Sequence, residues 1–143
     1  MLKLTLMSGL VAAGLSGFAH AQVIEQSEVP GPIAAQVAED ARQSGAQVDG
    51  IGGYELDLEG DGTTEWLVQP AYWTGGNSVS VRTFLFDGAD TGYASHVDLN
   101  FFRSIKRVEL DRPTLRLVIY ELLDGDPRCC PTGESTHNFA IEN

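Results

Sequence analysis

From Tyr54 onward, apolar and polar residues alternate in short segments that are separated by turn residues. A period of two is typical of half-buried strands, and clusters of glycine, aspartate and proline between the segments favour tight turns. The predicted strands cover residues 54–58, 65–68 with an end at Pro70, 78–86, 93–99, 105–110, 115–122 and, more weakly, 137–141. This pattern restricts most of the chain to antiparallel strands.

One helix is predicted before these strands, over residues 32–44. Pro32 suits the first helical turn, and Gly45 stands where helices commonly end. An apolar stripe recurs every four residues at Ile33, Val37 and Ala41. We therefore expect an α+β fold in which one N-terminal helix packs on a mainly antiparallel meander of six or seven strands. A small β-barrel or sandwich with a leading helix is the alternative.

The N-terminus has the three parts of a cleavable secretory signal peptide. Lys3 supplies a positive charge, an apolar run follows from Leu4 to Phe18, and Ala19-His20-Ala21 resembles a peptidase site. The apolar run is shorter than the roughly 20 residues that span a membrane, although an uncleaved anchor is the alternative. We predict a signal peptide at 1–21, a flexible arm at 22–31, a single domain at 32–143, and a periplasmic or secreted location.

The acidic balance excludes several partners. The chain has 20 acidic and 9 basic residues and a net charge of −11; loss of Lys3 leaves 8 basic residues and a net charge of −12. Such a protein repels phosphate backbones and anionic lipids, so we expect no nucleic-acid partner and no membrane insertion after cleavage of the signal peptide.

The segment between the first two predicted strands concentrates oxygen ligands. Calcium takes six to eight oxygens, and alternate positions of a tight loop can direct them to one centre. The candidate ligands are Asp57, Glu59, Asp61, the backbone carbonyl of Thr63, and Glu65. An EF-hand is excluded because Val68 occupies the position that requires a bidentate glutamate, and because the flanks are strands.

This loop resembles the nine-residue calcium loop of FG-GAP and related VCBS repeats. The match covers Asp57, Gly60, Asp61, Gly62 and Glu65. The chain departs from that pattern by carrying Glu59 in place of aspartate or asparagine, and by having one copy only. The resemblance implies a calcium ion between two strands, whereas the alternative is a hairpin turn stabilised by its own glycines and acids.

Cys129 and Cys130 are adjacent and are the only cysteines. In an oxidising compartment two free thiols would be unusual, so a disulfide between neighbours is predicted. Such a bond forms an eight-membered ring and closes no long loop, which makes its stabilising effect small. The alternatives are two thiols, links to another molecule, and metal or redox chemistry. A metal site is disfavoured because His96 and His137 stand at no recognisable metal-site spacing.

The combination of motifs from Tyr54 to Gly133 resembles small exported bacterial proteins of uncharacterised function, among them the actinobacterial LppP/LprE lipoproteins. The motifs are D-x-E-G-D-G-x-x-E-W from Asp57, a strand that ends in F-D-G, and D-G-D-P-x-C-C-P-T-G from Asp124. The resemblance implies a cell-envelope setting and no established reaction. The present chain lacks the cysteine that carries the lipid.

No recognised catalytic fingerprint occurs in the sequence. We predict a non-catalytic exported domain that binds an unknown envelope protein or ligand, with calcium as its one candidate cofactor. The first alternative is a secreted inhibitor or ligand-binding module with an aromatic surface at Trp66, Tyr72 and Trp73. The second is an acidic hydrolase assisted by calcium. His96 and His137 are interpreted as structural residues.

Overall fold

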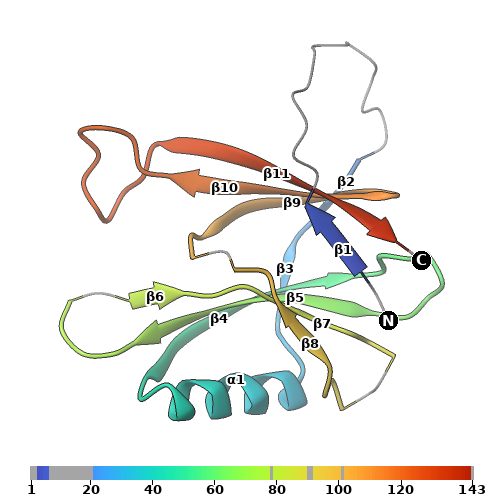
Figure 1. The fold of residues 1–143 in the computed structure, drawn as a ribbon, viewed down its shortest axis with the longest axis horizontal. Helices are drawn as coiled ribbons and strands as arrows, with labels where there is room; N and C mark the ends of the chain where they lie inside the picture. The colour runs from blue at the N-terminus through green and yellow to red at the C-terminus, as the bar shows by residue number, and fades with distance from the viewer. Residues whose placement is uncertain (1–2, 7–20, 78, 90–91, 101, 143) are drawn as a thin grey trace. The chain divides into compact units, whose positions relative to one another are not determined.

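The computed structural model describes residues 3–6, 21–77, 79–89, 92–100 and 102–142. These residues form one α-helix and two antiparallel sheets, without a closed barrel. The expectation of a mainly antiparallel protein with one helix is therefore confirmed, but the strands belong to two sheets instead of one meander. The chain divides into two compact units, which we describe separately: a central unit, Glu25–Ser104, and a terminal unit, Met1–Ile24 with Ile105–Asn143 (Figure 1).

The central unit contains the helix and a six-stranded sheet in the order β3-β4-β5-β7-β8, with β6 paired to β5. The elements are β3 (Gln26–Ser27), α1 (Gly31–Gln43), β4 (Gln47–Leu56), β5 (Glu65–Trp73), β6 (Val79–Val81), β7 (Phe84–Phe86) and β8 (His96–Asp98). Helix α1 begins one residue before the predicted start. It ends before Ser44, and Gly45 follows with a φ of +70°.

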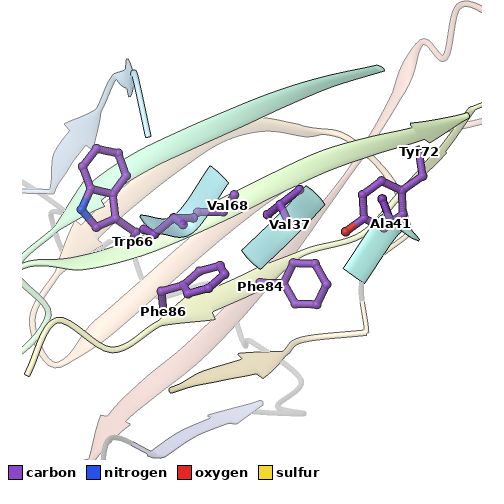
Figure 2. Close-up of a cluster of buried hydrophobic side chains, with 8 residues drawn as sticks. Val37, Ala41, Trp66, Val68, Tyr72, Phe84 and Phe86 are labelled. Carbon is purple, nitrogen blue, oxygen red and sulfur yellow. The ribbon is translucent and has the colours of Figure 1, made fainter. Parts of the chain in front are cut away.

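The core of the central unit forms around the predicted helix stripe. Ile33, Val37 and Ala41 are buried, and they belong to one cluster with side chains from β5 and β7. Residues two apart on a strand share a face, and the register places β5 and β7 residues of this cluster directly opposite one another. The strand residues of the cluster are Trp66, Val68, Tyr72, Phe84 and Phe86 (Figure 2).

Strand β5 is longer than predicted because it continues through Pro70. Next to Pro70 the partner of β5 changes: Trp66–Val68 pair with β7, whereas Ala71–Trp73 pair with β6. The Pro70 carbonyl accepts the Arg82 N–H at 3.1 Å. A proline is tolerated there because the ladder is already interrupted on that side. The same interruption divides the predicted strand 78–86 into β6 and β7.

The terminal unit is a five-stranded sheet in the order β1-β11-β10-β9-β2. Its strands are β1 (Lys3–Leu6), β2 (Gln22–Ile24), β9 (Ile105–Asp111), β10 (Thr114–Glu121) and β11 (Gly133–Glu142). One face carries buried apolar residues, among them Val108, Leu117 and Phe139. The other face carries ion pairs of Lys106 with Glu134 and of Glu109 with Arg107 and Arg116.

Two N-terminal predictions meet the structure differently. Residues 22–27, predicted as part of a flexible arm, form β2 and β3, because β9 and β4 offer them backbone partners. Within the predicted signal peptide, Lys3–Leu6 form β1 and pair antiparallel with Phe139–Glu142 of β11. Residues 7–20 lie outside the described residues. The pairing describes the uncleaved chain, so cleavage after Ala21 stays a prediction.

The single-domain prediction for 32–143 also stays a prediction, because a compact unit is not by itself a segment that folds alone. Helix α1 has 13 residues, and no helix in the described part of the chain is long and apolar enough to cross a bilayer.

Candidate functional site

Asp57 organises the loop between β4 and β5, which we call the acidic loop (Asp57–Glu65). Its Oδ1 accepts the backbone N–H groups of Gly60 at 2.7 Å and Asp61 at 3.1 Å, and its Oδ2 accepts that of Gly62 at 3.2 Å. Gly60 and Gly62 have φ values of +76° and +86°, a region that disfavours residues with a Cβ atom. The sequence thus places glycine where the turn needs it and aspartate where the turn needs an acceptor.

Asp61 and Glu65 also accept backbone hydrogen bonds within the loop. Asp61 Oδ1 accepts the Thr63 N–H at 2.7 Å, and this bond holds the pKa of Asp61 below its usual value. Glu65 is 4% exposed and accepts the N–H of Leu58 at 2.9 Å. Burial raises the pKa of Glu65, and the nearby charges of Asp57, Asp61 and Glu59 raise it further.

These bonds bear on the five predicted calcium ligands. Asp57, Asp61 and Glu65 each have at least one carboxylate oxygen bonded to the loop's own backbone, and Glu59 is exposed. Within the described residues, no group of three His, Cys, Asp or Glu side chains is placed to hold a metal ion. The loop as folded does not fit calcium without rearrangement. The observed hydrogen bonds support the alternative interpretation, a self-capped hairpin turn.

The turn that follows β7 packs against the backbone of the acidic loop. At Gly88, after β7, a Cβ atom would lie 1.7 Å from the carbonyl oxygen of Thr64 and 2.4 Å from its carbonyl carbon. Only glycine allows the two backbones to approach this closely. The F-D-G motif marks Gly88 as a turn residue in the sequence. Its contact with Thr64 could not be predicted, because that contact depends on the pairing of β5 with β7.

The connection between β10 and β11, residues 122–132, contains the cysteines; we call it the disulfide loop. Cys129 and Cys130 are bonded to each other, and both are exposed. Asp126 Oδ2 accepts the N–H groups of Leu123 at 2.9 Å and Thr132 at 2.8 Å, and its Oδ1 accepts the Thr132 hydroxyl at 2.8 Å. These bonds lower the pKa of Asp126, and the bond from the Thr132 N–H has the largest effect.

A serine, a histidine and a glutamate lie together on β10 and β11, which sequence reasoning missed. Ser135 donates its hydroxyl proton to Glu121 at 2.8 Å, and its Oγ lies 3.1 Å from His137 Nε2. A hydroxyl has one proton, so Ser135 can donate to only one of these two neighbours at a time, and the role of His137 Nε2 depends on its tautomer. The three side chains form one hydrogen-bonded group.

A second polar network in the central unit was also missed. Tyr72 donates to Asp40 on α1 at 2.7 Å, and Arg82 bridges Asp40, at 3.0 Å, to Asp98. Burial, with the bond to Asp40, raises the pKa of Tyr72. The network fixes α1 to β5 and β8 with residues that are far apart in sequence, so no local motif could reveal it.

The predicted aromatic surface does not form. Trp66 and Tyr72 are 5% and 3% exposed, because they share the β5 face that belongs to the helix cluster. Trp73 follows on the opposite face, is 41% exposed, and donates from Nε1 to the Gly76 carbonyl at 2.9 Å. The alternation of β5 thus separates the three aromatic residues.

His96, interpreted from the sequence as a structural residue, stacks on Phe86, with ring centroids 4.9 Å apart.

Comparison of the chain with protein-family models, with curated proteins and with solved structures found no match.

Proposed function

We propose that this chain is an exported, non-catalytic domain of the cell envelope or periplasm that binds an extended segment of a partner protein at the outer edge of β11. Three features support the export and the envelope setting: the signal-peptide pattern, the acidic composition and the resemblance to LppP/LprE-like proteins. The observation that carries the binding role is the pairing of β1 with β11.

Strand β1 is the outermost strand of its sheet, and β11 is its one neighbour in that sheet. Removal of residues 1–21 would leave the backbone groups of Phe139–Glu142 without their β1 partners. An exposed edge of this kind binds extended peptides by strand addition. In the uncleaved chain, β1 indicates which sequences fit: Leu4 lies opposite Ile141, Leu6 lies opposite Phe139, and Thr5 donates to Glu142 at 3.0 Å.

Hydrogen exchange of residues 22–143, with and without a synthetic peptide of residues 1–10, tests this proposal. We expect the peptide to slow the exchange of amides within Phe139–Glu142 and to leave the amides of α1 unchanged. A peptide in which Thr5 is replaced by proline is the matched control, because proline lacks the donor and disrupts strand pairing. Equal exchange with both peptides, or no slowing by either, would rule out the edge as the binding site.

The polar groups of both units support a non-catalytic role. The acids of the acidic loop cap their own turn, Ser135 gives its proton to Glu121, and Asp40 and Asp98 neutralise Arg82. Each of these groups has a hydrogen-bond or ion-pair partner within its own unit.

A structural calcium ion at the acidic loop is a separate part of the proposal. It is supported by the negative charge of Asp57, Asp61 and Glu59 around Glu65, which adds to the effect of burial in raising the pKa of Glu65. Binding would require Asp57 and Asp61 to exchange backbone donors for the ion. Calorimetric titration of residues 22–143 decides the question: a dissociation constant of about 10⁻³ M or tighter, lost in Asp61→Ala, supports calcium. No heat would leave the loop as a turn only.

A further inference from the structure

The disulfide loop carries its two cysteines as exposed residues. Cys129 and Cys130 are both exposed, as are the preceding Leu122 and Leu123 at 42% and 55%. Disulfides that hold a domain together are usually inaccessible to external thiols, whereas exposed disulfides are the labile or reactive ones. Exposure therefore allows a thiolate to approach this bond in the folded protein.

Hydrogen bonds hold the loop in addition to the disulfide. The ladder between β10 and β11 runs to the pair Glu121 and Gly133, which closes the base of the loop. Inside the loop, Asp126 accepts the three hydrogen bonds described above and also donates its N–H to the Leu123 carbonyl at 3.0 Å. The Cys130 N–H donates to the Pro127 carbonyl at 2.9 Å.

The bond also contributes little through chain entropy. A disulfide restricts the unfolded chain in proportion to the logarithm of the loop that it closes, and neighbouring residues close none. The bond therefore joins exposed residues, and we expect neither the geometry of the loop nor the stability of the unit to require it. These are the properties of a disulfide that reacts without unfolding the protein.

We propose that the Cys129–Cys130 pair is a thiol–disulfide exchange site that reacts in the folded protein with an external dithiol. A thiolate of the dithiol attacks one cysteine sulfur, the Cys129–Cys130 bond breaks, and the other cysteine leaves as a thiolate. The second thiol of the reagent then attacks the mixed disulfide. The products are two protonated cysteines and a cyclic reagent disulfide, so the cysteine pair gains two electrons and the dithiol loses two.

Adjacency selects the dithiol over a monothiol. After attack by a monothiol, the freed cysteine is the immediate neighbour of the mixed disulfide and can expel the monothiol again. The attack of the neighbouring thiol is intramolecular, so it competes with attack by a second molecule of the monothiol. We expect the site to accept electrons from a dithiol and to return to the disulfide with a monothiol whenever the neighbouring thiol attacks first.

The experiment compares the rate of reduction with the rate of global unfolding. The native chain of residues 22–143 is treated with dithiothreitol, quenched by alkylation, and followed by mass. We expect the rate to be proportional to dithiothreitol concentration and at least about ten times the unfolding rate in the same buffer. The near-ultraviolet circular dichroism of the reduced protein should match that of the oxidised protein. A rate that is independent of dithiothreitol and equal to the unfolding rate would overturn the proposal.

Glutathione and a single-cysteine variant test the role of adjacency. We expect reduced glutathione to leave no mixed disulfide on the native chain. In Cys130→Ser, oxidised glutathione should give a stable mixed disulfide at Cys129, because the resolving thiol is gone. A mixed disulfide that persists on the native chain in reduced glutathione would show that the neighbouring thiol does not resolve it, and would contradict the proposal. These readouts require neither β11 edge binding nor calcium.

Discussion

The acidic loop and the disulfide loop use the same turn chemistry in different surroundings. Each connects two neighbouring antiparallel strands, and in each one aspartate, Asp57 or Asp126, accepts several hydrogen bonds from its own loop. The acidic loop is anchored in the core by Leu58, which is 1% exposed, and is supported behind by Gly88. In the disulfide loop the apolar residues Leu122 and Leu123 are exposed. Capping therefore defines both turns, and only the anchored loop has a backbone that cannot move without disturbing a core.

The largest difference in stability between the loops should appear when the glycine that packs against each loop is replaced by alanine. In Gly88→Ala the new Cβ meets the Thr64 backbone at 1.7 Å, so we expect a loss of about 3 kcal/mol or more in urea unfolding. In Gly133→Ala the closest atoms are Cδ2 and Cγ of the exposed Leu123 side chain, at 2.7 and 2.8 Å, which can move, followed by the Glu121 carbonyl oxygen at 3.0 Å. We expect a loss of about 1 kcal/mol there.

Gly50→Ala is the matched control, because nothing lies within 4 Å of its added Cβ. It should be neutral or slightly stabilising, since alanine restricts the unfolded chain more than glycine does. If Gly133→Ala costs as much as Gly88→Ala, the disulfide loop is anchored as firmly as the acidic loop, and the comparison fails.

Removing the aspartate cap of the acidic loop should have an intermediate effect. Asp57→Ala leaves three backbone N–H groups without their acceptor, and the cost of losing such a cap is about 1–2 kcal/mol. Urea unfolding in chelator measures it free of any calcium effect. Asp57→Asn keeps one carbonyl acceptor and should lose less. If Asp57→Ala is as stable as the parent chain, the glycines alone define the turn.

The turns themselves were predictable from sequence, because their determinants are local. Asp57, Gly60 and Gly62 stand within six residues, and the helix stripe at Ile33, Val37 and Ala41 needs only a period to be recognised. The length of β11 was not predictable, since Ser135 and His137 occupy the face that further along holds Phe139 and Ile141. Polar residues at these positions conceal the alternation.

Properties that depend on pairing between distant segments could not be predicted. The division into two sheets, the support of Thr64 by Gly88, and the bond from Tyr72 to Asp40 all join residues that are more than twenty positions apart. The aromatic surface of the alternative interpretation does not form for a related reason. Trp66 and Tyr72 are nearby in sequence with Trp73, but strand alternation and the helix cluster decide which of them are exposed.

The pH dependence of stability should have opposite signs in the two loops. Glu65 has a raised pKa in the folded state, so the stability it contributes is present below its unfolded pKa and is lost as pH rises through the folded pKa. Asp126 has a lowered pKa, so its contribution is present above its unfolded pKa and is lost as pH falls through the folded pKa.

Thermal unfolding of Glu65→Gln and Asp126→Asn between about pH 3.5 and pH 7 separates these signs, since unfolded carboxyl groups titrate near pH 4. We expect Glu65→Gln to be more stable than the parent chain at pH 7 and similar to it at the acidic end. Asp126→Asn should be less stable at pH 7, with the difference shrinking on acidification. If both variants change the stability at pH 7 in the same direction, the carboxyl groups of Glu65 and Asp126 do not differ in the sign of their contribution, and the comparison of the two loops fails.

The smallest effect should come from the disulfide. We expect the double change Cys129→Ser and Cys130→Ser to lower the free energy of unfolding by less than about 1 kcal/mol, because the bond closes no chain loop and Asp126 holds the turn without it. Urea unfolding under oxidising conditions measures this value, and Asp126→Asn in the double-serine background shows what holds the loop. That third substitution should cost no more there than in the parent chain if the bond and the cap act independently.

A loss of 2–4 kcal/mol in the double-serine chain, as for disulfides that close long loops, would make the bond a structural element. The proposed reaction with dithiols would then have to disturb the terminal unit, and the contrast between an anchored turn and a reactive one would no longer hold.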